Sequence, residues 1–210
     1  MTSPILVAGA TGGIGQQVVG KLLAQETEVR ALSRDLDRAR GLFGERPCLE
    51  LVAGDVRDPA SLSAAVSGAR AIICTVGAKA PAGDASPEKI DYEGVRNLVL
   101  AAQQAGISRF ILVSSISVTH PENPLNNFGR VLDWKLKGEE VLRTSGLNYT
   151  IIRPDWLSDE PGGKIAFRVG QGDRLSGGRI SRSDVAAFCI AALDDISTYQ
   201  QIFPIASVCK

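Results

Sequence analysis

Residues Pro4 to Lys21 read PILVAGATGGIGQQVVGK, and the fold of the whole chain is built around them. It opens with a run of apolar residues, 5–8, of the kind found in a strand that is buried on both faces. A cluster of glycines follows. The next segment has apolar residues about one and two helical turns apart, at Ile14, Val18, Leu22 and Leu23. The pattern predicts a strand, a tight turn and a helix.

The turn carries Gly9, Gly12 and Gly15 at intervals of three residues. Glycine permits a tight turn, lets backbone amides approach a ligand closely and allows a helix to pack tightly on a strand. The first amides of a helix also attract anions. We therefore expect a pyrophosphate to bind here. The alternative is a loop that only needs positive φ angles, but the position between a strand and a helix favours the pyrophosphate.

The composition limits the possible partners. The chain has 210 residues, enough for one domain with a sizeable core. Its 23 Lys and Arg balance its 23 Asp and Glu, which argues against a nucleic acid or an anionic membrane as partner. No apolar run reaches the length of a membrane span, and residues 1–4 leave no room for a signal peptide. We expect a cytoplasmic protein that acts on a small molecule.

Cysteine and histidine usage gives no sign of a metal site. The four cysteines lie far apart, without the spacing of metal ligands, and there is one histidine. Cys48 and Cys74 fall in expected strands and Cys189 in an expected helix, so we interpret them as small buried side chains in a reducing compartment. Ser115 lacks the G-x-S-x-G context of a serine hydrolase.

Strands and helices alternate along the chain. Strands are expected at 28–32, 49–53, 70–77, 109–113 and 148–154, and helices at 35–43, 60–66, 87–105 and 131–143. This alternation predicts an α/β fold, a Rossmann-type doubly wound parallel sheet in a single domain, 1–210. Beyond Pro154 we expect a short strand (165–169), a helix opened by Ser183 and Asp184, and a last strand (202–206). We expect residues 155–210 to pack as a small cap.

The end of the second strand bears on cofactor choice. An acidic residue there accepts a hydrogen bond from the 2′-hydroxyl of the NAD ribose, whereas a cation pairs with the 2′-phosphate of NADP. The strand ends at Ser33 and Arg34, and a guanidinium matches a phosphate with two hydrogen bonds. The sequence therefore predicts NADP. Two alternatives stay open: Arg34 only solvates the next helix, or Asp35 and Asp37 allow NAD as well.

Three later strand ends lie at the same edge of the expected sheet. Asp55 follows the third strand, where its carboxylate is placed to accept a hydrogen bond from an adenine amino group, with Val56 against the ring. The alternative is that Asp55 is a helix N-cap. Asp58 is the better candidate for that role, because Pro59 follows it at the first helical position. The fourth strand runs into a tip of small residues, where a ligand is expected. Serines follow the fifth strand.

Together these features resemble the atypical short-chain dehydrogenase/reductases, in the NmrA-like NAD(P)-binding group that includes flavin and biliverdin reductases and chloroplast NADP-binding relatives. The matching pieces cover roughly residues 4–155. They are GATGGIG at 9–15, Arg34, GDV at 54–56, VSS at 113–115, KGEE at 137–140 and YTIIRP at 149–154.

The resemblance implies a role for each matching position. The pyrophosphate would bind to Gly9, Thr11, Gly12, Gly13, Ile14 and Gly15. The rest of the cofactor would contact Ser33, Arg34, Asp55, Val56, Thr75, Val76, Gly77, Lys137 and Pro154, with Lys137 on the nicotinamide ribose. Ser115 and Lys137 would be the catalytic residues.

One departure from the family pattern bears on the reaction. Members that reduce carbonyls use Tyr-x-x-x-Lys, in which the lysine lowers the pKa of the tyrosine that passes the proton. Four residues before Lys137 stands Asp133. We therefore expect hydride transfer to an aromatic, flavin-like or quinone-like acceptor, which spreads the charge over its rings. Trp134 and Trp156 are candidates to stack on it or to pack in the core. The alternative is an NADP-binding sensor without turnover.

Overall fold

The computed structural model describes residues 3–163, 167–169 and 178–207. Its centre is a sheet in the order β3-β2-β1-β4-β5-β6-β10-β8. These strands are β1 (Ile5–Ala8), β2 (Val29–Ser33), β3 (Leu49–Ala53), β4 (Ala71–Cys74), β5 (Arg109–Val113), β6 (Asn148–Pro154), β8 (Phe167–Val169) and β10 (Gln201–Ser207). Neighbours pair in parallel, except that β8 runs antiparallel to β10. The predicted Rossmann-type doubly wound sheet is confirmed.

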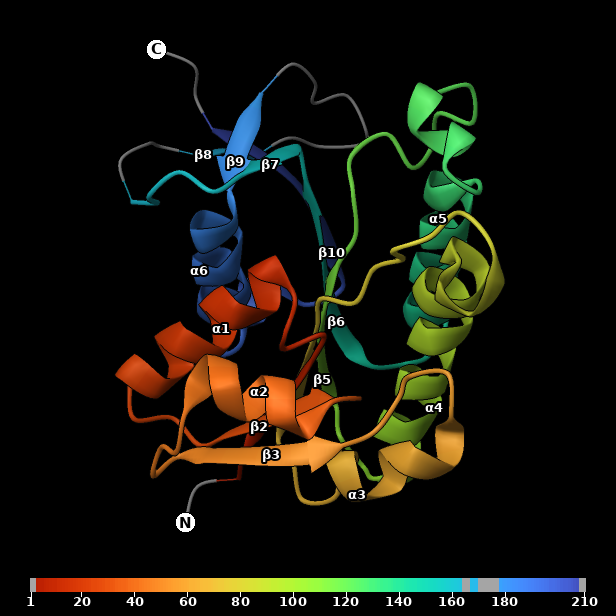
Figure 1. The fold of residues 1–210 in the computed structure, drawn as a ribbon. Helices are drawn as coiled ribbons and strands as arrows, with labels where there is room; N and C mark the ends of the chain where they lie inside the picture. The colour runs from red at the N-terminus through yellow and green to blue at the C-terminus, as the bar shows by residue number, and fades with distance from the viewer. Residues whose placement is uncertain (1–2, 164–166, 170–177, 208–210) are drawn as a thin grey trace.

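Helices cover both faces of the sheet. One face carries α1 (Gly13–Ala24), α2 (Leu36–Phe43) and α6 (Arg182–Ala192), and the other carries α3 (Leu62–Val66), α4 (Val95–Gln104) and α5 (Val131–Arg143). Figure 1 shows α1 and α6 on the left of the strands and α4 and α5 on the right. The chain therefore forms a three-layer α/β sandwich.

The apolar runs of the strands build two separate cores. Side chains alternate across a strand, so Leu6 and Ala8 of β1 face the core under α3, α4 and α5. Ile5 and Val7 face the core under α1 and α6. All four residues have no solvent exposure. Burial on both faces explains why these strands are uniformly apolar and do not alternate with polar residues.

The end of the chain differs from the expected cap. β10 extends the main sheet beside β6, and α6 packs along α1. Among the described residues after Pro154, only β7 (Trp156–Ser158) and β9 (Arg179–Ser181) form a separate two-stranded sheet. The helix opens at Ser181, whose hydroxyl accepts from the amide of Asp184 at 3.0 Å, and not at Ser183. The apolar side chains of Val185 and Cys189 complete the core under α1, which places this helix in the main body.

The expected helix 87–105 has two parts. It begins as a π-helix, η3 (Glu88–Gly94), and continues as α4. The helix α5 packs directly on η3 at Gly138. A Cβ at this position would lie 2.3 Å from the carbonyl oxygen of Asp91, so only glycine allows this close approach. π-helical turns are frequent at functional sites. This packing places one face of α5 against residues of η3.

Two of the three described cysteines are buried. Burial raises the pKa of the Cys74 thiol to about 12 and also raises the pKa of Cys189. Cys48 is partly exposed in the turn before β3, which corrects its expected place in a strand. Cys209 lies outside the described residues.

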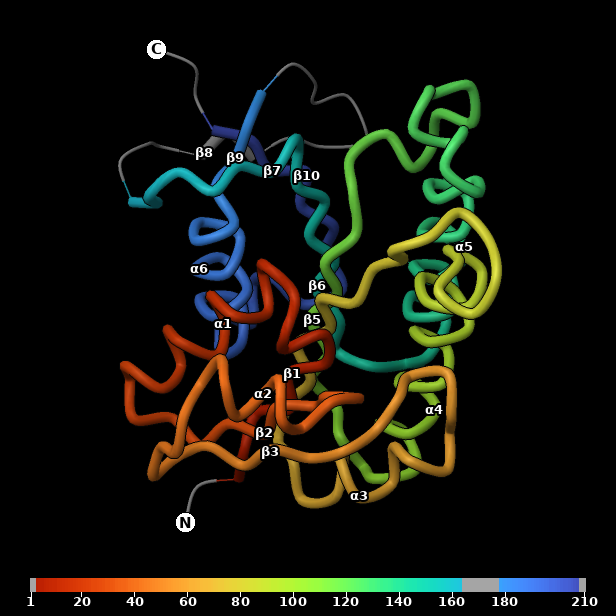
Figure 2. Tube along the Cα trace, in the orientation of Figure 1, coloured from red at the N-terminus to blue at the C-terminus, as the bar shows by residue number. Residues whose placement is uncertain are grey.

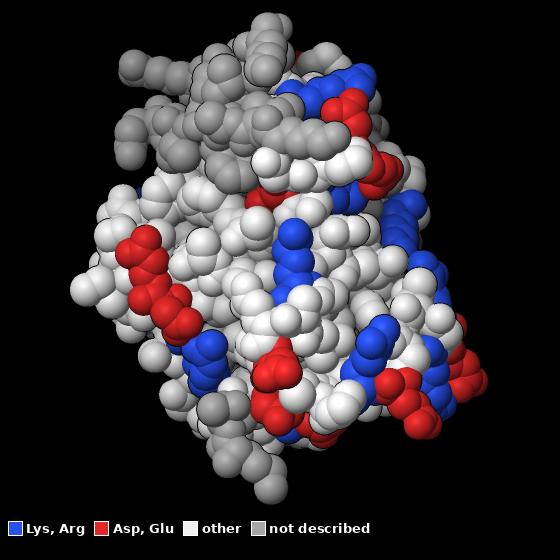
Figure 3. Space-filling view, turned by 90° about the vertical axis from the view of Figure 1, so that its left-hand side faces the viewer, with Lys and Arg blue, Asp and Glu red and all other residues white. Residues whose placement is uncertain are grey.

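The described helices and surface give further limits. The longest of these helices, α5, has 13 residues, and none of them is long and apolar enough to cross a bilayer. On the face drawn in Figure 3, Lys and Arg are interspersed with Asp and Glu around a broad uncharged area. The described residues of this face therefore form no large region of one charge.

Candidate cofactor and acceptor site

Two adjoining cavities open at the carboxyl ends of the strands, with volumes of about 300 and 420 Å³. They share the lining residues Ile14, Thr75, Val76, Gly77, Leu157 and Arg182. The first also contains Gly9, Thr11, Gly12, Gly13, Ser33, Arg34, Asp55 and Val56, and the second contains Ser115 and Pro154. All predicted site residues except Gly15 and Lys137 therefore line one continuous cleft.

The turn after β1 lies beside the segment after β4 (Figure 2). Gly9 has φ +82°, and a Cβ there would lie 2.8 Å from the backbone of Thr75. The Thr75 hydroxyl donates to the Ala8 carbonyl at 3.1 Å, which ties the two segments together. Any other residue at position 9 would be strained and would separate them.

Gly15 lies behind the cavity wall. A Cβ at this position would lie 2.1 Å from the Gly9 carbonyl oxygen, so the glycine lets α1 approach the turn. The helix has Gly12 as its N-cap, with no side-chain cap and no acidic residue in its first turn. Its first amides and its positive dipole end therefore face the cavity without a protein anion on α1 to satisfy them. Such an end binds phosphate.

The three residues at the end of β2, Ser33, Arg34 and Asp35, make different contacts. Ser33 is buried and its hydroxyl donates to the Asp35 carbonyl at 2.7 Å. The Asp35 carboxylate caps α2 by accepting from the Arg38 amide at 2.9 Å. Arg34 is exposed and lines the first cavity. The acidic neighbour is thus engaged in the helix cap, while the arginine faces the cavity.

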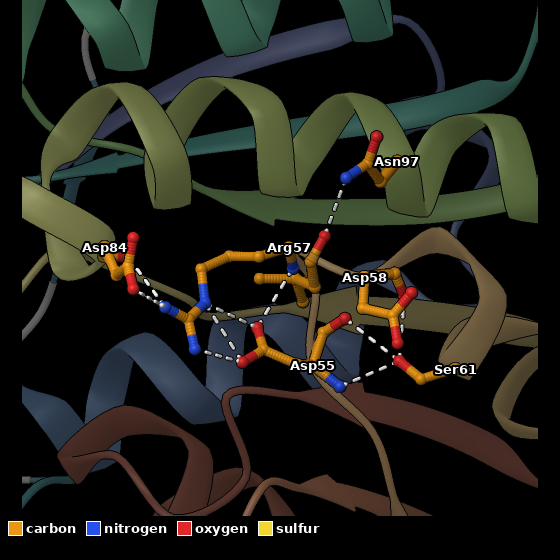
Figure 4. Close-up of polar contacts among 7 residues, drawn as sticks. Asp55, Arg57, Asp58, Ser61, Asp84 and Asn97 are labelled. Carbon is orange, nitrogen blue, oxygen red and sulfur yellow. Dashed lines mark hydrogen bonds and ion pairs between the residues drawn. The ribbon is translucent and has the colours of Figure 1, made fainter.

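Asp55 lines the first cavity but already has a strong partner (Figure 4). Arg57 Nε donates to both carboxylate oxygens of Asp55 at 3.0 Å, and Nη2 lies 2.5 Å from Oδ2. The hydrogen bond from Arg57 lowers the pKa of Asp55. Arg57 also donates to the Asp84 carbonyl at 3.1 Å, which joins this loop to the segment after β4. The sequence predicted that the Asp55 carboxylate accepts a hydrogen bond from adenine, but it did not predict the ion pair with Arg57.

The loop that carries Asp55 is fixed at several points. Ser61 Oγ accepts from the Asp55 amide at 3.0 Å, and Asn97 of α4 donates to the Val56 carbonyl at 2.9 Å (Figure 4). Asp58 accepts from the Ala60 amide at 3.1 Å and caps the short helix that starts at Pro59. The N-cap role that the sequence favoured for Asp58 is confirmed.

The lysine in the cleft is Lys135, not Lys137. Lys135 lines the second cavity, and its Nζ lies 2.7 Å from Oδ1 of the buried Asp91 on η3. Lys137 is exposed and is not among the described residues that line either cavity. Its Nζ lies 4.1 Å from the ring centroid of Trp134. The structure therefore places Lys135, and not Lys137, at the wall of the second cavity, and the contact of Lys137 with the nicotinamide ribose stays a prediction.

Two serines after β5 face the second cavity. Ser115 lines it as expected and is partly exposed. Ser114 is 7% exposed, and its hydroxyl is the one buried side-chain polar atom without a hydrogen bond among the described residues. A buried hydroxyl without a partner is costly, so a polar ligand atom would stabilise it. The family pattern in the sequence pointed only to the neighbouring Ser115.

Two further lining residues come from the end of the chain. Trp156 on β7 is 63% exposed and lines the second cavity, whereas Trp134 stacks on Tyr92 with centroids 5.8 Å apart. Arg182 at the start of α6 lines both cavities. No local pattern in the sequence pointed to Arg182, because only the fold brings residue 182 to the turn after β1.

A family model described as NAD(P)H-binding matches residues 9–196. An uncharacterised chloroplast protein of Arabidopsis thaliana is 38% identical, with 91% of this chain and 72% of that protein covered. Sanguinarine reductase of Eschscholzia californica is 30% identical, with 97% and 88% covered. Protein TIC 62 of Arabidopsis thaliana is 36% identical over 92% of this chain, which spans 34% of that longer protein.

Solved structures agree with this match. An NAD-dependent epimerase/dehydratase-type protein of Bacillus halodurans is 26% identical, with a TM-score of 0.88 and coverage of 98% of this chain and 94% of that one. The anaerobillin reductase ChuY of Escherichia coli O157:H7 is 29% identical, with a TM-score of 0.81 and coverage of 97% and 96%. The chain therefore belongs to the NAD(P)H-binding oxidoreductase family and has the fold of an atypical short-chain dehydrogenase/reductase.

Proposed function

We propose that the chain is an NADPH-dependent reductase whose acceptor is an aromatic, flavin-like or quinone-like compound. The observation that carries the proposal is that Lys135 lines the second cavity together with Ser114, whose buried hydroxyl has no hydrogen-bond partner among the described residues. Four residues before Lys135 stands Val131, so this register also lacks the tyrosine of Tyr-x-x-x-Lys. The site can therefore orient and stabilise an acceptor but has no phenol to protonate it.

A bound nicotinamide would supply the hydride. The residues of this chain would hold and orient the cofactor. We assign the diphosphate to the turn at 9–14 and to the first amides of α1, and the ribose path to the segment 75–77. Pro154 would bound the nicotinamide position, since it lines the second cavity.

The second cavity suits an acceptor that needs little proton transfer. The Lys135 ammonium would stabilise negative charge that develops on an acceptor oxygen or nitrogen, and Ser114 and Ser115 would donate hydrogen bonds to it. The exposed indole of Trp156 offers a flat surface for an aromatic ring. The proton would come from water, because the cavity is open to solvent. A conjugated acceptor tolerates this slow protonation, because its rings delocalise the charge.

Two comparisons support a reductase. Sanguinarine reductase and the anaerobillin reductase ChuY both cover nearly all of this chain, and both are named for reductions. We extend the reductase chemistry to this chain on the basis of these two relatives and the lining of its second cavity. The acceptor class is our inference from Trp156, Lys135 and the missing tyrosine.

We propose NADPH over NADH because of Arg34. The guanidinium faces the first cavity, whereas the nearest acidic residue, Asp35, is engaged as the cap of α2. A charged partner for a 2′-phosphate is therefore present, and a free carboxylate for a ribose hydroxyl is not available from Asp35.

The test is to supply NADPH with a panel of flavins, quinones and conjugated carbonyls and to follow the absorbance of the reduced nicotinamide. Steady oxidation with at least one acceptor is expected, and it should be weakened in Lys135→Met and Ser114→Ala. No turnover with any acceptor, in protein that binds NADPH tightly, would overturn the reductase proposal.

That second outcome defines the alternative function. Protein TIC 62 is a much longer relative, and this chain matches about a third of it. A chain of this type that binds NADP without turnover would act as a nucleotide-sensing or interaction protein. The missing tyrosine is compatible with this alternative, and the acceptor panel separates the two functions.

A further inference from the structure

We propose that Arg182 is a cofactor-positioning residue that binds the diphosphate, and that Asp159 competes with the cofactor for it. The proposal rests on NAD(P)H binding, which family membership shows, and not on the reductase activity proposed above. It assigns to the end of the chain a direct part in holding the cofactor.

The position of the Arg182 side chain is the first argument. A Cβ placed on Gly13 would lie 2.7 Å from Arg182 Cδ and 2.8 Å from Nε, so the arginine lies directly against the first residue of α1. A larger residue than glycine at position 13 would collide with the Arg182 side chain. The same arginine lines both cavities, at the boundary between them.

The local charges are the second argument. The first turn of α1 has no acidic residue and no side-chain cap, so the positive end of the helix has no anion from its own helix. Arg182 adds a full positive charge at the same end. Two positive groups placed together are unfavourable unless an anion lies between them, and a guanidinium binds a phosphate with two parallel hydrogen bonds.

The present partner of Arg182 is easily displaced. Its Nη1 lies 2.7 Å from Oδ1 of Asp159, whose side chain is 89% exposed. Exposed ion pairs contribute little net stability. The diphosphate carries more charge and is held by the α1 amides as well, so the guanidinium should exchange Asp159 for the cofactor.

The test measures nucleotide affinity by calorimetry for wild type, Arg182→Gln and Asp159→Asn. Two nucleotides are compared: NADP, and 2′-AMP, which has the adenosine and 2′-phosphate but no diphosphate. Arg182→Gln should raise the Kd for NADP by about tenfold or more and leave the Kd for 2′-AMP unchanged. Asp159→Asn should lower the Kd for NADP, because it removes the competitor.

A matched control is available in Arg70, which pairs with the exposed Asp194 at 2.9 Å and lines neither cavity. Arg70→Gln should bind both nucleotides like wild type. Retained 2′-AMP binding shows that each variant is folded.

Equal NADP affinity in wild type and Arg182→Gln would overturn the proposal, as would an equal loss of NADP and 2′-AMP binding. Unchanged NADP affinity in Asp159→Asn would overturn the competition. None of these outcomes depends on turnover, so failure of the reductase proposal is recorded separately by the acceptor panel.

Discussion

Lys135 Nζ and Asp91 Oδ1 lie 2.7 Å apart, and the Asp91 side chain is only 1% exposed. The other oxygen of Asp91 accepts from the Ala78 amide at 3.0 Å. One carboxylate thus joins α5, the π-helix η3 and the segment after β4. The ammonium is held at the wall of the second cavity by a partner that is itself fixed.

This pair predicts which lysine matters. Lys135→Met should lower kcat/KM for NADPH oxidation by on the order of 10²-fold, because it removes the only cation that we assign to the acceptor. Lys137→Met is the matched control on the same helix and should stay within about twofold of wild type. The measurement is steady-state kinetics with the best acceptor of the panel. A larger loss of kcat/KM in Lys137→Met than in Lys135→Met would support Lys137 as the catalytic lysine.

Asp91 should act through Lys135. Asp91→Asn keeps the volume and a hydrogen-bond acceptor for Ala78 but removes the charge that holds the ammonium. We expect kcat to fall while the Kd for NADPH changes little, because Asp91 lines neither of the two large cavities. Stopped-flow kinetics and calorimetry separate the two quantities. A loss of cofactor affinity with unchanged kcat would contradict this role.

Arg34 predicts cofactor preference. Arg34→Ala should raise the Kd for NADP by about tenfold or more and leave the Kd for NAD nearly unchanged, because only NADP has the 2′-phosphate. Arg40 is a suitable control, since it is exposed on α2 and pairs with Asp37 at 2.8 Å. Calorimetry with both nucleotides gives the ratio. An unchanged ratio in Arg34→Ala would show that the guanidinium only solvates the helix.

The successes and errors of sequence analysis have a common physical cause. The strand, glycine turn and helix at 4–21 were predictable because each depends on residues close together in the chain. Lys135 and Lys137 are two residues apart on α5, so their side chains point about 160° apart around the helix. Only the packing of Gly138 on η3 decides which lysine faces the cleft. The sequence alone contains no such contact.

Two other site features depend on distant segments in the same way. Arg182 reaches Gly13 because α6 packs along α1, although 169 positions separate the two residues in the sequence. The buried Asp91 meets Lys135 only after η3 and α5 have packed together. Sequence patterns therefore identified the edge of the sheet where the site lies, but not its full set of charged residues.

The ion pair between Arg57 and Asp55 predicts a pH dependence of stability. The hydrogen bond from Arg57 lowers the pKa of Asp55 below its ordinary value of 3.8. A lowered native pKa adds stability that is fully present above 3.8 and is lost as the pH falls through the native value. Arg57→Met should therefore cost at most about 1 kcal/mol at pH 7, and the difference from wild type should shrink in acid. Urea unfolding at pH 7 and pH 3 measures it. A difference that grows in acid would contradict the assignment.

Of all these substitutions, we expect replacement of Arg109 to lower the free energy of unfolding the most. It is 4% exposed on β5, and burial lowers the pKa of its guanidinium. The side chain donates to three carbonyls and two threonine hydroxyls: Leu193 (3.0 Å), Asn148 (2.6 Å), Ala192, Thr150 (2.8 Å) and Thr198 (3.0 Å). It thereby satisfies the last carbonyls of α6 and joins that helix to β6.

Arg109→Met keeps much of the volume but leaves those buried carbonyls without a donor. We expect the free energy of unfolding to fall by about 3–5 kcal/mol, measured by urea denaturation. Arg40→Met, at an exposed position, should stay within about 0.5 kcal/mol of wild type. A loss below about 1 kcal/mol in Arg109→Met would mean that water or a shift of α6 satisfies the carbonyls. The guanidinium would then not be needed to hold α6 to the sheet.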